Sequence, residues 1–306
     1  MVDFDKHISF SVLRLFLMFV AVVGNSLFLF VILKNQKLRG TSANLLLAQL
    51  CVANFILGIS AGTRGISTLI FQSYDMTIFP RWLCLVLGSP TVLGIHLSQT
   101  TMVAIALDRF LCVQFPVAYR QMETTFIALS RLFICLGYSV LGTGASYLGV
   151  PFNDDDRVQV CSTSAVITAW YSNYWFFFAS IFTVFIYVAY ISIYVLFTRR
   201  ASGDISATQR ALFGTMTAVL VSYFLLWCLP NLLSAIFKLI AVPTVVKQLV
   251  SALTGLCSNI TAATNIFIYG WKHPEMRKYV KRAFVGGQST AVTPVAAVTK
   301  PSSSQF

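Results

Sequence analysis

An acidic and a basic residue stand side by side at the end of a long apolar stretch. Asp108 and Arg109, followed by Phe110, close an apolar-rich segment that begins near residue 83. Charges are costly in hydrocarbon unless they are paired, hydrated or used, so charged residues in such a place usually have a function. Adjacent opposite charges can neutralise each other or separate. The pair is therefore a candidate switch.

Three asparagines, Asn25, Asn54 and Asn265, lie within other apolar stretches. An amide in such a place finds a hydrogen-bond partner on a neighbouring helix or an internal water. The three amides can share one network across three helices, or each can make a separate contact between helices. The sequence leaves both arrangements open.

Covalent and metal chemistry are not indicated. Only three histidines occur, and the sequence has no cluster of His, Cys, Asp or Glu with the spacing of metal ligands or of an activated nucleophile. We therefore expect neither an enzyme nor a cofactor.

The composition excludes a water-soluble globular protein. Hydrophobic residues make up 57% of the 306 residues, charged residues make up 10%, and the mean hydropathy is +0.77, whereas a soluble domain carries about 25% charged residues. Seven apolar stretches are long enough to cross about 30 Å of hydrocarbon. They lack the alternation of a membrane β-barrel, so the sequence predicts an all-α membrane protein, a seven-transmembrane helix bundle. The stretches are 10–33, 44–63, 83–107, 126–150, 166–197, 211–237 and 245–270.

Basic residues are distributed unevenly between the two sides of this bundle. Fifteen of the 22 lysines and arginines fall on the side that holds the C-terminus, and seven fall on the other side. Because cationic loops stay in the cytoplasm, we expect an extracellular N-terminus and a cytoplasmic C-terminus. The net charge of +12 then indicates contact with anionic lipid headgroups rather than with nucleic acid.

Two of the seven cysteines, Cys84 and Cys161, lie on the expected extracellular side. An oxidising compartment lets them pair. A bridge between them would hold the loop between the fourth and fifth stretches over the mouth of the bundle. Two free thiols are the alternative.

Several of these residues resemble motifs of rhodopsin-like (class A) G-protein-coupled receptors, in order and in spacing. Asp108-Arg109-Phe110 follows Cys84 by 24 residues and is similar to the family's Asp-Arg-Tyr motif. The resemblance covers all seven stretches. Its other motifs are Gly24-Asn25, Asn44 with Asn54, the segment from Phe224 to Pro230 that contains Trp227, and the segment from Asn265 to Tyr269.

The resemblance implies a receptor that binds an extracellular ligand, either a chemosensory small molecule or a peptide, and activates a heterotrimeric G protein. It implies that Asp108 holds Arg109 at rest and that Arg109 meets the G protein after the sixth helix swings outward. Pro230 supplies the kink in that helix. Trp227, Asn265 and Tyr269 would belong to the same activation switch.

The chain departs from the family pattern at several positions. Asn54 replaces an Asp that helps to bind sodium, which argues against sodium regulation. Trp227 and Cys228 are transposed, so the indole is turned about 100° around the helix, and Ile266 replaces a proline. Such altered motifs resemble the chemosensory receptors of nematodes, especially the serpentine class closest to rhodopsin-like receptors.

Four residues are candidates for the ligand pocket: Arg64, Thr91, His96 and Trp227. Arg64 can meet an anionic ligand, or it can reach the interface or pair with the loop acids Asp154 to Asp156. Thr91 stands where amine receptors carry an Asp, which argues against an amine ligand. His96 either lines the pocket or is a buried neutral histidine that is bonded to a neighbouring hydroxyl.

The expected domains are an extracellular N-terminus (1–9), the receptor domain (10–270), an amphipathic membrane-surface helix (271–285) and a disordered cytoplasmic tail (286–306). Serines and threonines in the tail offer sites for a receptor kinase and then arrestin; a plain linker is the alternative.

Two other functions compete with the receptor. A seven-span channel or transporter would line a path with intramembrane charge or broken helices, and neither pattern is visible. A receptor-like protein without G-protein coupling would explain the altered motifs, but Asp108, Arg109 and the basic loops argue against it.

Overall fold

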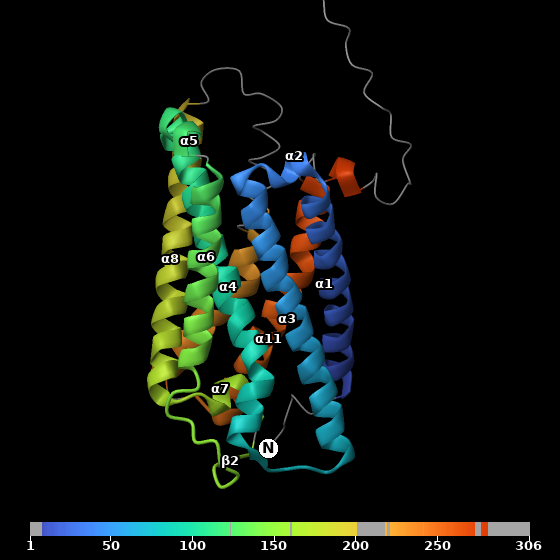
Figure 1. Ribbon diagram of the computed structural model, residues 1–306. Coiled ribbons are helices and arrows are strands. Elements are labelled where there is room, and N and C mark those ends of the chain that lie inside the picture. The colour runs from blue at the N-terminus through green and yellow to red at the C-terminus, as the bar shows by residue number, and fades with distance from the viewer. Residues whose placement is uncertain are drawn as a thin grey trace, which may run out of the picture.

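The computed structural model describes residues 8–122, 124–159, 161–200, 218, 221–240, 242–272 and 277–280. Within this part seven long helical segments run side by side along one axis (Figure 1). They are α1 (Ile8–Lys34), α3 (Ser42–Ser73), α4 (Arg81–Gln114), α6 (Thr125–Ala145), α8 (Ala169–Arg200), the π-helix η2 (Phe224–Cys228) continued by α10 (Leu229–Leu239), and α11 (Thr244–Lys272). The predicted seven-helix all-α bundle is confirmed.

Short elements lie at the two ends of the bundle. One end, which we call the Asp108 end (residues 35–42 and 108–131), carries α2 (Gln36–Arg39) and α5 (Pro116–Met122). The other, the disulfide end (residues 74–85 and 146–168), carries α7 (Thr163–Val166) and the strands β1 (Phe79–Pro80) and β2 (Arg157–Val158). The two strands pair antiparallel, with Phe79 opposite Val158.

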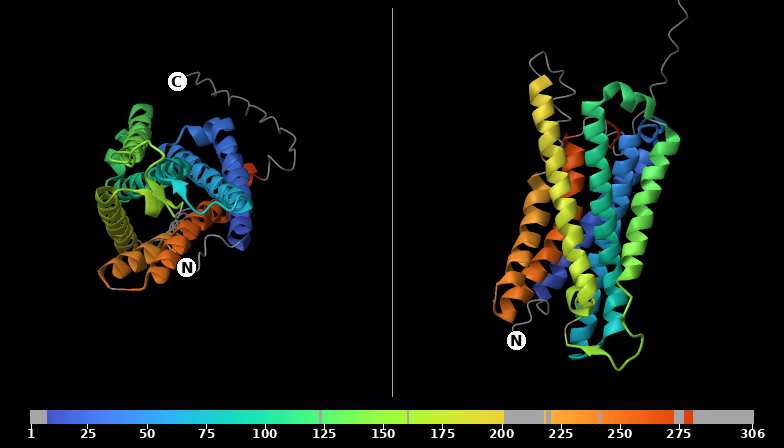
Figure 2. Two further views of the ribbon diagram at one scale, coloured as in Figure 1. Left: turned by 90° about the horizontal axis from the view of Figure 1, so that it is seen from below. Right: turned by 90° about the vertical axis from the view of Figure 1, so that its left-hand side faces the viewer.

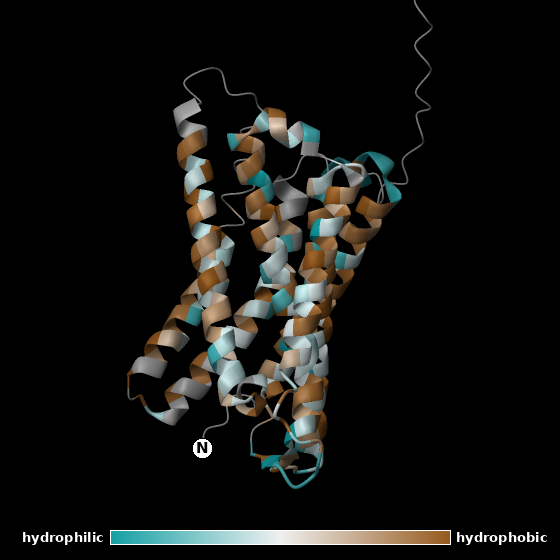
Figure 3. Ribbon diagram, turned by 60° about the vertical axis from the view of Figure 1, so that its left-hand side comes forward, coloured by the Kyte–Doolittle hydropathy of each residue, from teal (hydrophilic) through white to brown (hydrophobic). Residues whose placement is uncertain are grey.

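The membrane-length helices are recognisable by hydropathy as well as by length. Five described helices are long and apolar enough to cross a membrane: α1, α3, α4, α6 and α8. The apolar segment 221–237 is shorter, and of the predicted sixth stretch the structure describes only residue 218 and residues 221–237. Brown apolar ribbon dominates the helices in Figure 3.

Helices α3 and α4 extend furthest beyond the predicted stretches. The stretches 44–63 and 83–107 lie inside α3 and α4, which run over residues 42–73 and 81–114. Hydropathy detects only the part of a helix that crosses hydrocarbon. Backbone hydrogen bonding continues the helix beyond it, so the apolar stretch is a lower limit of helix length.

Helix α4 is the centre of the bundle. It packs against α3, α6 and α8 and also contacts α5 and α7. Seen from the disulfide end, α10 and α11 lie next to each other between α8 and α1 (Figure 2, left). Residues on α4 can therefore reach most of the other helices, and those at its two termini meet both sets of loops.

Small residues bring α1 and α3 into close contact. A Cβ atom at Gly58 would lie 3.0 Å from Ala21 Cβ, and one at Gly62 would overlap the Met18 side chain. Small residues allow such close approach of helices, which is a common basis of helix association in membranes.

Candidate functional site

Asp108 lies at the Asp108 end of α4, and its carboxylate is completely buried. One carboxylate oxygen, Oδ1, accepts a hydrogen bond of 2.7 Å from Arg131 Nη1 and one of 3.0 Å from the Tyr119 hydroxyl. Arg109 Nη2 lies 3.5 Å from the other oxygen, Oδ2. Thus α5 and α6, as well as α4 itself, supply partners to one acid.

Arg131 lies near the beginning of α6, which starts after Thr124 because the Thr124 hydroxyl caps the helix by accepting from the Ile127 N–H (3.4 Å). Its Nη1 also lies 3.4 Å from Ser42 Oγ at the start of α3. The sequence reasoning counted Arg131 only as a basic residue of a loop. A signal was present in the sequence, because Arg131, like Asp108, is a charged residue near one end of an apolar stretch.

The aromatic residue that follows the pair, Phe110, packs against the main hydrophobic core of the bundle. Arg109, by contrast, keeps 26% of its side chain exposed. The end of α4 therefore anchors one neighbour of Arg109 in the core and leaves the guanidinium group accessible from the Asp108 end.

The three asparagines differ in their surroundings within the described part of the chain. The Asn25 amide donates to Ala21 O (2.7 Å) within α1 and to Ala262 O (3.2 Å) on α11. Asn54 is buried, and neither of its amide atoms has a hydrogen-bond partner among the described residues. Asn265 is buried and lines a cavity. Among the described residues, Asn25 thus makes a contact between helices, whereas Asn54 shares no hydrogen bond with the other two amides; a network through an internal water remains a prediction.

A small cavity lies between α3, α4, α11 and the segment that carries η2. Its volume is about 20 Å³, counted as space open to the centres of water molecules, which is room for one or two waters rather than for a ligand. Its walls combine apolar side chains with serine, threonine and amide groups. The lining residues are Leu57, Ile95, Ser98, Gln99, Met102, Ser222, Tyr223, Trp227, Ser258, Thr261 and Asn265.

Trp227 is buried and lines this cavity. The sequence placed its indole about 100° away from the family position, but Trp227 lies within the π-helical turn Phe224–Cys228. A π-helical turn holds about one residue more than an α-helical turn, so it shifts the helix register by a similar angle. Pro230, which lacks an N–H donor, follows directly in the first turn of α10.

Gln99 and Tyr223 connect α4 to the residues that precede η2. Both side chains are buried, and the Tyr223 hydroxyl donates to Gln99 Oε1. The sequence reasoning did not select either residue. Their signal was present, since Ile95, Gln99 and Met102 recur at helical spacing and Gln99 is a polar residue inside an apolar span.

His96 does not line the cavity. It is fully buried and points toward α6 and α8, because one residue beyond Ile95 on α4 corresponds to a rotation of about 100°. Its Nδ1 lies 2.9 Å from Val92 O and its Nε2 lies 3.2 Å from the Tyr174 hydroxyl. Since a carbonyl only accepts, Nδ1 carries the proton. These contacts are those of the alternative, a buried histidine that is bonded to a neighbouring hydroxyl; a place in the ligand pocket remains a prediction.

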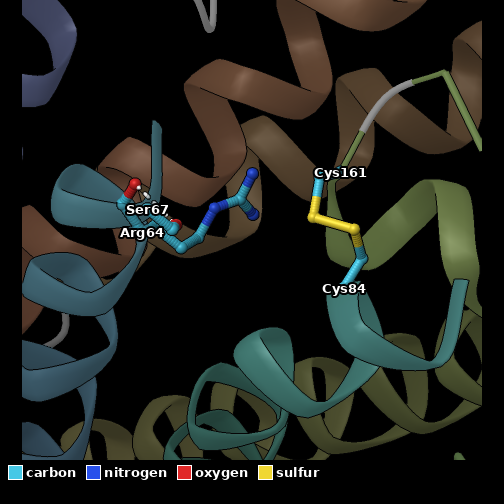
Figure 4. Close-up of a disulfide and its surroundings, with 4 residues drawn as sticks. All are labelled: Arg64, Ser67, Cys84 and Cys161. Carbon is cyan, nitrogen blue, oxygen red and sulfur yellow. Dashed lines mark hydrogen bonds between the residues drawn. A yellow bond between two sulfur atoms is a disulfide. The ribbon is translucent and has the colours of Figure 1, made fainter. Parts of the chain in front are cut away.

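The other two candidates for the ligand pocket lie nearer the disulfide end. The hydroxyls of Thr91 and Ser60 form a hydrogen bond between α4 and α3. Arg64 is partly buried on α3, and its guanidinium group extends toward the Cys84–Cys161 bridge (Figure 4). Thr91 therefore has a role between helices, whereas Arg64 faces the mouth of the bundle.

The predicted disulfide is confirmed: Cys84 at the start of α4 is bonded to Cys161, with a Cα–Cα distance of 5.2 Å. Arg81 adds a second connection to the same loop. Its Nε donates to Val166 O (2.7 Å), Nη2 donates to Ile167 O (3.3 Å), and Nη1 contacts Asp156 Oδ2 (3.2 Å). The loop is thus held on both sides of its cysteine.

Asp154 and Asp156, two of the acids considered as partners of Arg64, have other described partners. Asp156 pairs with Arg81, and Asp154 Oδ1 accepts from Trp82 Nε1 at 3.0 Å. These two acids therefore attach their loop to the start of α4.

Two expected elements near the C-terminus are described only in part. Tyr269 lies on α11, but its side chain is outside the described residues. Of the surface helix predicted over 271–285, residues 271 and 272 belong to α11 instead. Residues 277–280 are described and helical, and Tyr279 and Val280 pack against the main core. The domain boundaries, including the tail 286–306, remain predictions.

A sodium ion does not fit the described cavity. Every described lining residue is uncharged, and Asn54 on α3 supplies an amide where the family has a carboxylate. Neutral groups alone do not offset the cost of burying a cation. Among the described residues there is also no group of three His, Cys, Asp or Glu side chains that could hold a metal ion.

Seven helices, a loop bridged to the start of the third long helix, and an acid–base pair at the far end of that helix define a seven-transmembrane receptor of the rhodopsin-like class. The family model "Serpentine type 7TM GPCR chemoreceptor Srsx" matches residues 18–284. The chain belongs to this family of serpentine receptors. This confirms the resemblance drawn from the motifs, and it identifies the chain as a receptor rather than an enzyme.

Curated relatives are receptors too. The chain is 33% identical to human (Homo sapiens) galanin receptor type 2 over 127 residues, 41% of this chain and 31% of that receptor. It is 24% identical to mouse (Mus musculus) neuropeptide FF receptor 2 over 266 residues, 83% and 63% of the two chains. It is 30% identical to the allatostatin-A receptor of Bombyx mori over 128 residues, 42% and 34%. The chain thus spans less than half the length of the galanin receptors it matches.

Proposed function

We propose that the protein is a G-protein-coupled receptor that binds an extracellular ligand at the disulfide end and activates a heterotrimeric G protein at the Asp108 end. The excess of lysine and arginine on the side of the Asp108 end supports this orientation, with the N-terminus outside and the C-terminus in the cytoplasm. Family membership supports the coupling.

The observation that carries the proposal is the position of Arg109. It is the partly exposed member of an ion pair with a buried carboxylate, at 3.5 Å from Asp108 Oδ2, and it has no hydrogen bond to that oxygen in the described structure. An ion pair at this distance needs little free energy to open, so a change elsewhere in the bundle can shift its population. A G protein that binds the released guanidinium would stabilise the open form.

The cavity supports a route between the two ends. Tyr223 and Trp227 from the segment around η2 meet α4 and α11 across a small cavity, and they do not fill it. A helix that carries a π-turn followed by a proline can bend there. A ligand that repacks this region would change the contacts of the η2 segment with α4 and α11.

Nucleotide exchange on purified G proteins tests the proposal. Wild-type receptor, Arg109→Ala and the control Arg39→Ala, which removes an exposed cation of the same end, are compared at equal surface density across a panel of G proteins. We expect exchange by wild type and Arg39→Ala and its loss in Arg109→Ala. Silence of wild type across the panel, together with ligand-evoked ionic current in the same membranes, would overturn the proposal in favour of a channel.

We propose a peptide as the ligand, because the named relatives include receptors for neuropeptide FF and for galanin. Arg64, which extends toward the disulfide (Figure 4), would meet an acidic group of that peptide. Arg64→Ala should then raise the half-maximal concentration of an acidic peptide agonist by about tenfold, which corresponds to 1.4 kcal/mol. An unchanged concentration response would exclude this role of Arg64.

A receptor kinase and arrestin complete the proposed partners. The serines and threonines of residues 286–306 would be phosphorylated after activation, and arrestin would bind the phosphates. Deletion of residues 286–306 should slow desensitisation under continuous agonist. Desensitisation at the wild-type rate would remove the tail from the mechanism.

A further inference from the structure

Asp108 is shared unequally between two arginines. Arg131 Nη1 lies 2.7 Å from Oδ1, whereas Arg109 Nη2 lies 3.5 Å from Oδ2. Charge-assisted hydrogen bonds between a guanidinium and a carboxylate have lengths of about 2.7–2.9 Å. By this measure the primary partner of Asp108 is Arg131 on α6, and its own neighbour Arg109 is the weaker partner.

The second carboxylate oxygen strengthens this conclusion. Oδ1 accepts from both Arg131 and the Tyr119 hydroxyl, while Oδ2 is buried and accepts no hydrogen bond from the described residues. Arg131 is itself oriented by Ser42 Oγ on α3. The donors that hold the acid therefore come from α5 and α6, with support from α3, and not from the residue that is expected to leave.

This arrangement changes the cost of releasing Arg109. A buried carboxylate that loses its sole cation would be left unpaired, which is strongly unfavourable. Here Arg131 and Tyr119 stay bonded when Arg109 moves away, so Asp108 remains neutralised. Two cations face one acid, so the repulsion between their charges also favours the departure of the weaker partner.

We infer that Arg131 is the resting counter-ion of Asp108 and that, by occupying this acid, it loosens Arg109 and sets the basal activity of the receptor. The inference rests on the proposed coupling to a G protein. Arg131 is a positioning residue in this account, because it acts on Arg109 through Asp108. We therefore expect the basal activity to change in an unusual direction. Removal of this cation near the coupling surface lowers the basal activity, because Asp108 then binds Arg109 more tightly.

A double-mutant cycle tests the inference. Basal nucleotide exchange is measured for wild type, Arg131→Gln, Asp108→Asn and the double variant at equal surface density, with Arg131→Lys and Arg39→Gln as controls. We expect Arg131→Gln to lower basal exchange by about tenfold in the wild-type background, the effect of a shift of about 1.4 kcal/mol between coupled partners. In the Asp108→Asn background the same substitution should have no effect. Arg131→Lys keeps the charge and should restore most of the activity, and Arg39→Gln should change nothing.

The opposite results are equally specific. Arg131→Gln that lowers exchange to the same extent in both backgrounds would show a direct contact with the G protein or a purely structural role. Arg131→Gln that raises exchange would show that Arg131 restrains the receptor. Either result overturns the inference.

A second readout does not depend on coupling. The thermal unfolding midpoint of the same four proteins in detergent reports the ion pair itself, and Arg131→Gln should lower it by about 5 °C in the wild-type background alone. If wild type activates no G protein, the proposed function and the role in basal activity both fail, and the melting cycle still decides whether Arg131 is the counter-ion. Equal shifts of the midpoint in both backgrounds would reject that assignment as well.

Discussion

The two ends of helix α4 have opposite arrangements of charge. At the disulfide end one guanidinium, Arg81, meets three acceptors, of which one is the carboxylate of Asp156. At the Asp108 end one carboxylate meets two guanidinium groups and a hydroxyl. The first arrangement balances its charges and uses its donors. The second has a surplus cation.

This difference indicates which end can change its structure. The contacts of Arg81 have one favourable arrangement, and the Cys84–Cys161 disulfide attaches the same loop covalently to α4. The Asp108 cluster has two, since Arg109 can stay near Oδ2 or leave while the acid keeps Arg131. A fixed end and an end with alternatives are what a membrane receptor needs when a stable binding surface controls a separate response.

Loss of the disulfide should have the largest effect. In Cys84→Ser/Cys161→Ser the bond that closes a loop over a sequence separation of 77 residues is absent, which costs about 4.5 kcal/mol in the chain-entropy model. We expect little protein at the cell surface and a much lower unfolding temperature. Normal surface expression with an unchanged melting temperature would show that the Arg81 cluster alone fixes this end.

Removal of Arg81 should have the next largest effect. Arg81→Met loses hydrogen bonds from a charged donor and should destabilise the loop by about 2 kcal/mol. Hydrogen exchange of residues 154–159 and 161–167 should accelerate, and reductant should open the disulfide faster. The matched control is Arg157→Met, whose Nε donates only to the nearby Asp154 O at 2.8 Å in the described structure. Equal effects of the two variants would remove the special role of Arg81.

The contact between Gln99 and Tyr223 tests the region between the two ends. Tyr223→Phe leaves the buried Gln99 Oε1 without its donor, which should cost about 1–2 kcal/mol of unfolding free energy. Gln99→Leu combined with Tyr223→Phe removes both partners and should recover most of that loss. Thermal unfolding of the two single variants and the double variant measures the coupling, and strictly additive losses would contradict a direct bond.

Tyr119 should have the smallest effect. Tyr119→Phe removes the weaker of the two donors to Asp108 Oδ1, so Asp108 should hold Arg109 slightly more strongly. Basal nucleotide exchange should fall about threefold, in the same direction as for Arg131→Gln, because a neutral donor contributes about half of a charged one. An increase in basal exchange would show that Tyr119 restrains Arg109 instead.

The fixed end was easier to predict from the sequence than the changeable end. Cys84 and Cys161 were the two cysteines on the extracellular side of the predicted bundle, so each had one possible disulfide partner there. The helices themselves follow from apolar length alone. These features depend on the residue types and on their order along the chain, and a single sequence specifies both.

Contacts between helices depended on rotation about each axis, which the sequence does not specify. The prediction placed His96 among the pocket candidates, but one residue on α4 is enough to turn it toward Tyr174. The π-helical turn that brings Trp227 into the cavity has no clear signal in the residues themselves. The pairing of Arg131 with Asp108 was found only in the structure, because it depends on how far α4 and α6 are shifted relative to each other along the axis of the bundle.

The most direct test compares the two ends in one assay. Basal nucleotide exchange on a responsive G protein is measured for wild type, Arg109→Ala and Arg81→Met, each corrected for receptor at the surface. The account predicts that exchange is lost in Arg109→Ala and retained in Arg81→Met, because the response is produced at the Asp108 end and Arg81 only fixes the opposite loop. Exchange that survives in Arg109→Ala, or that is lost equally in both variants, would contradict it.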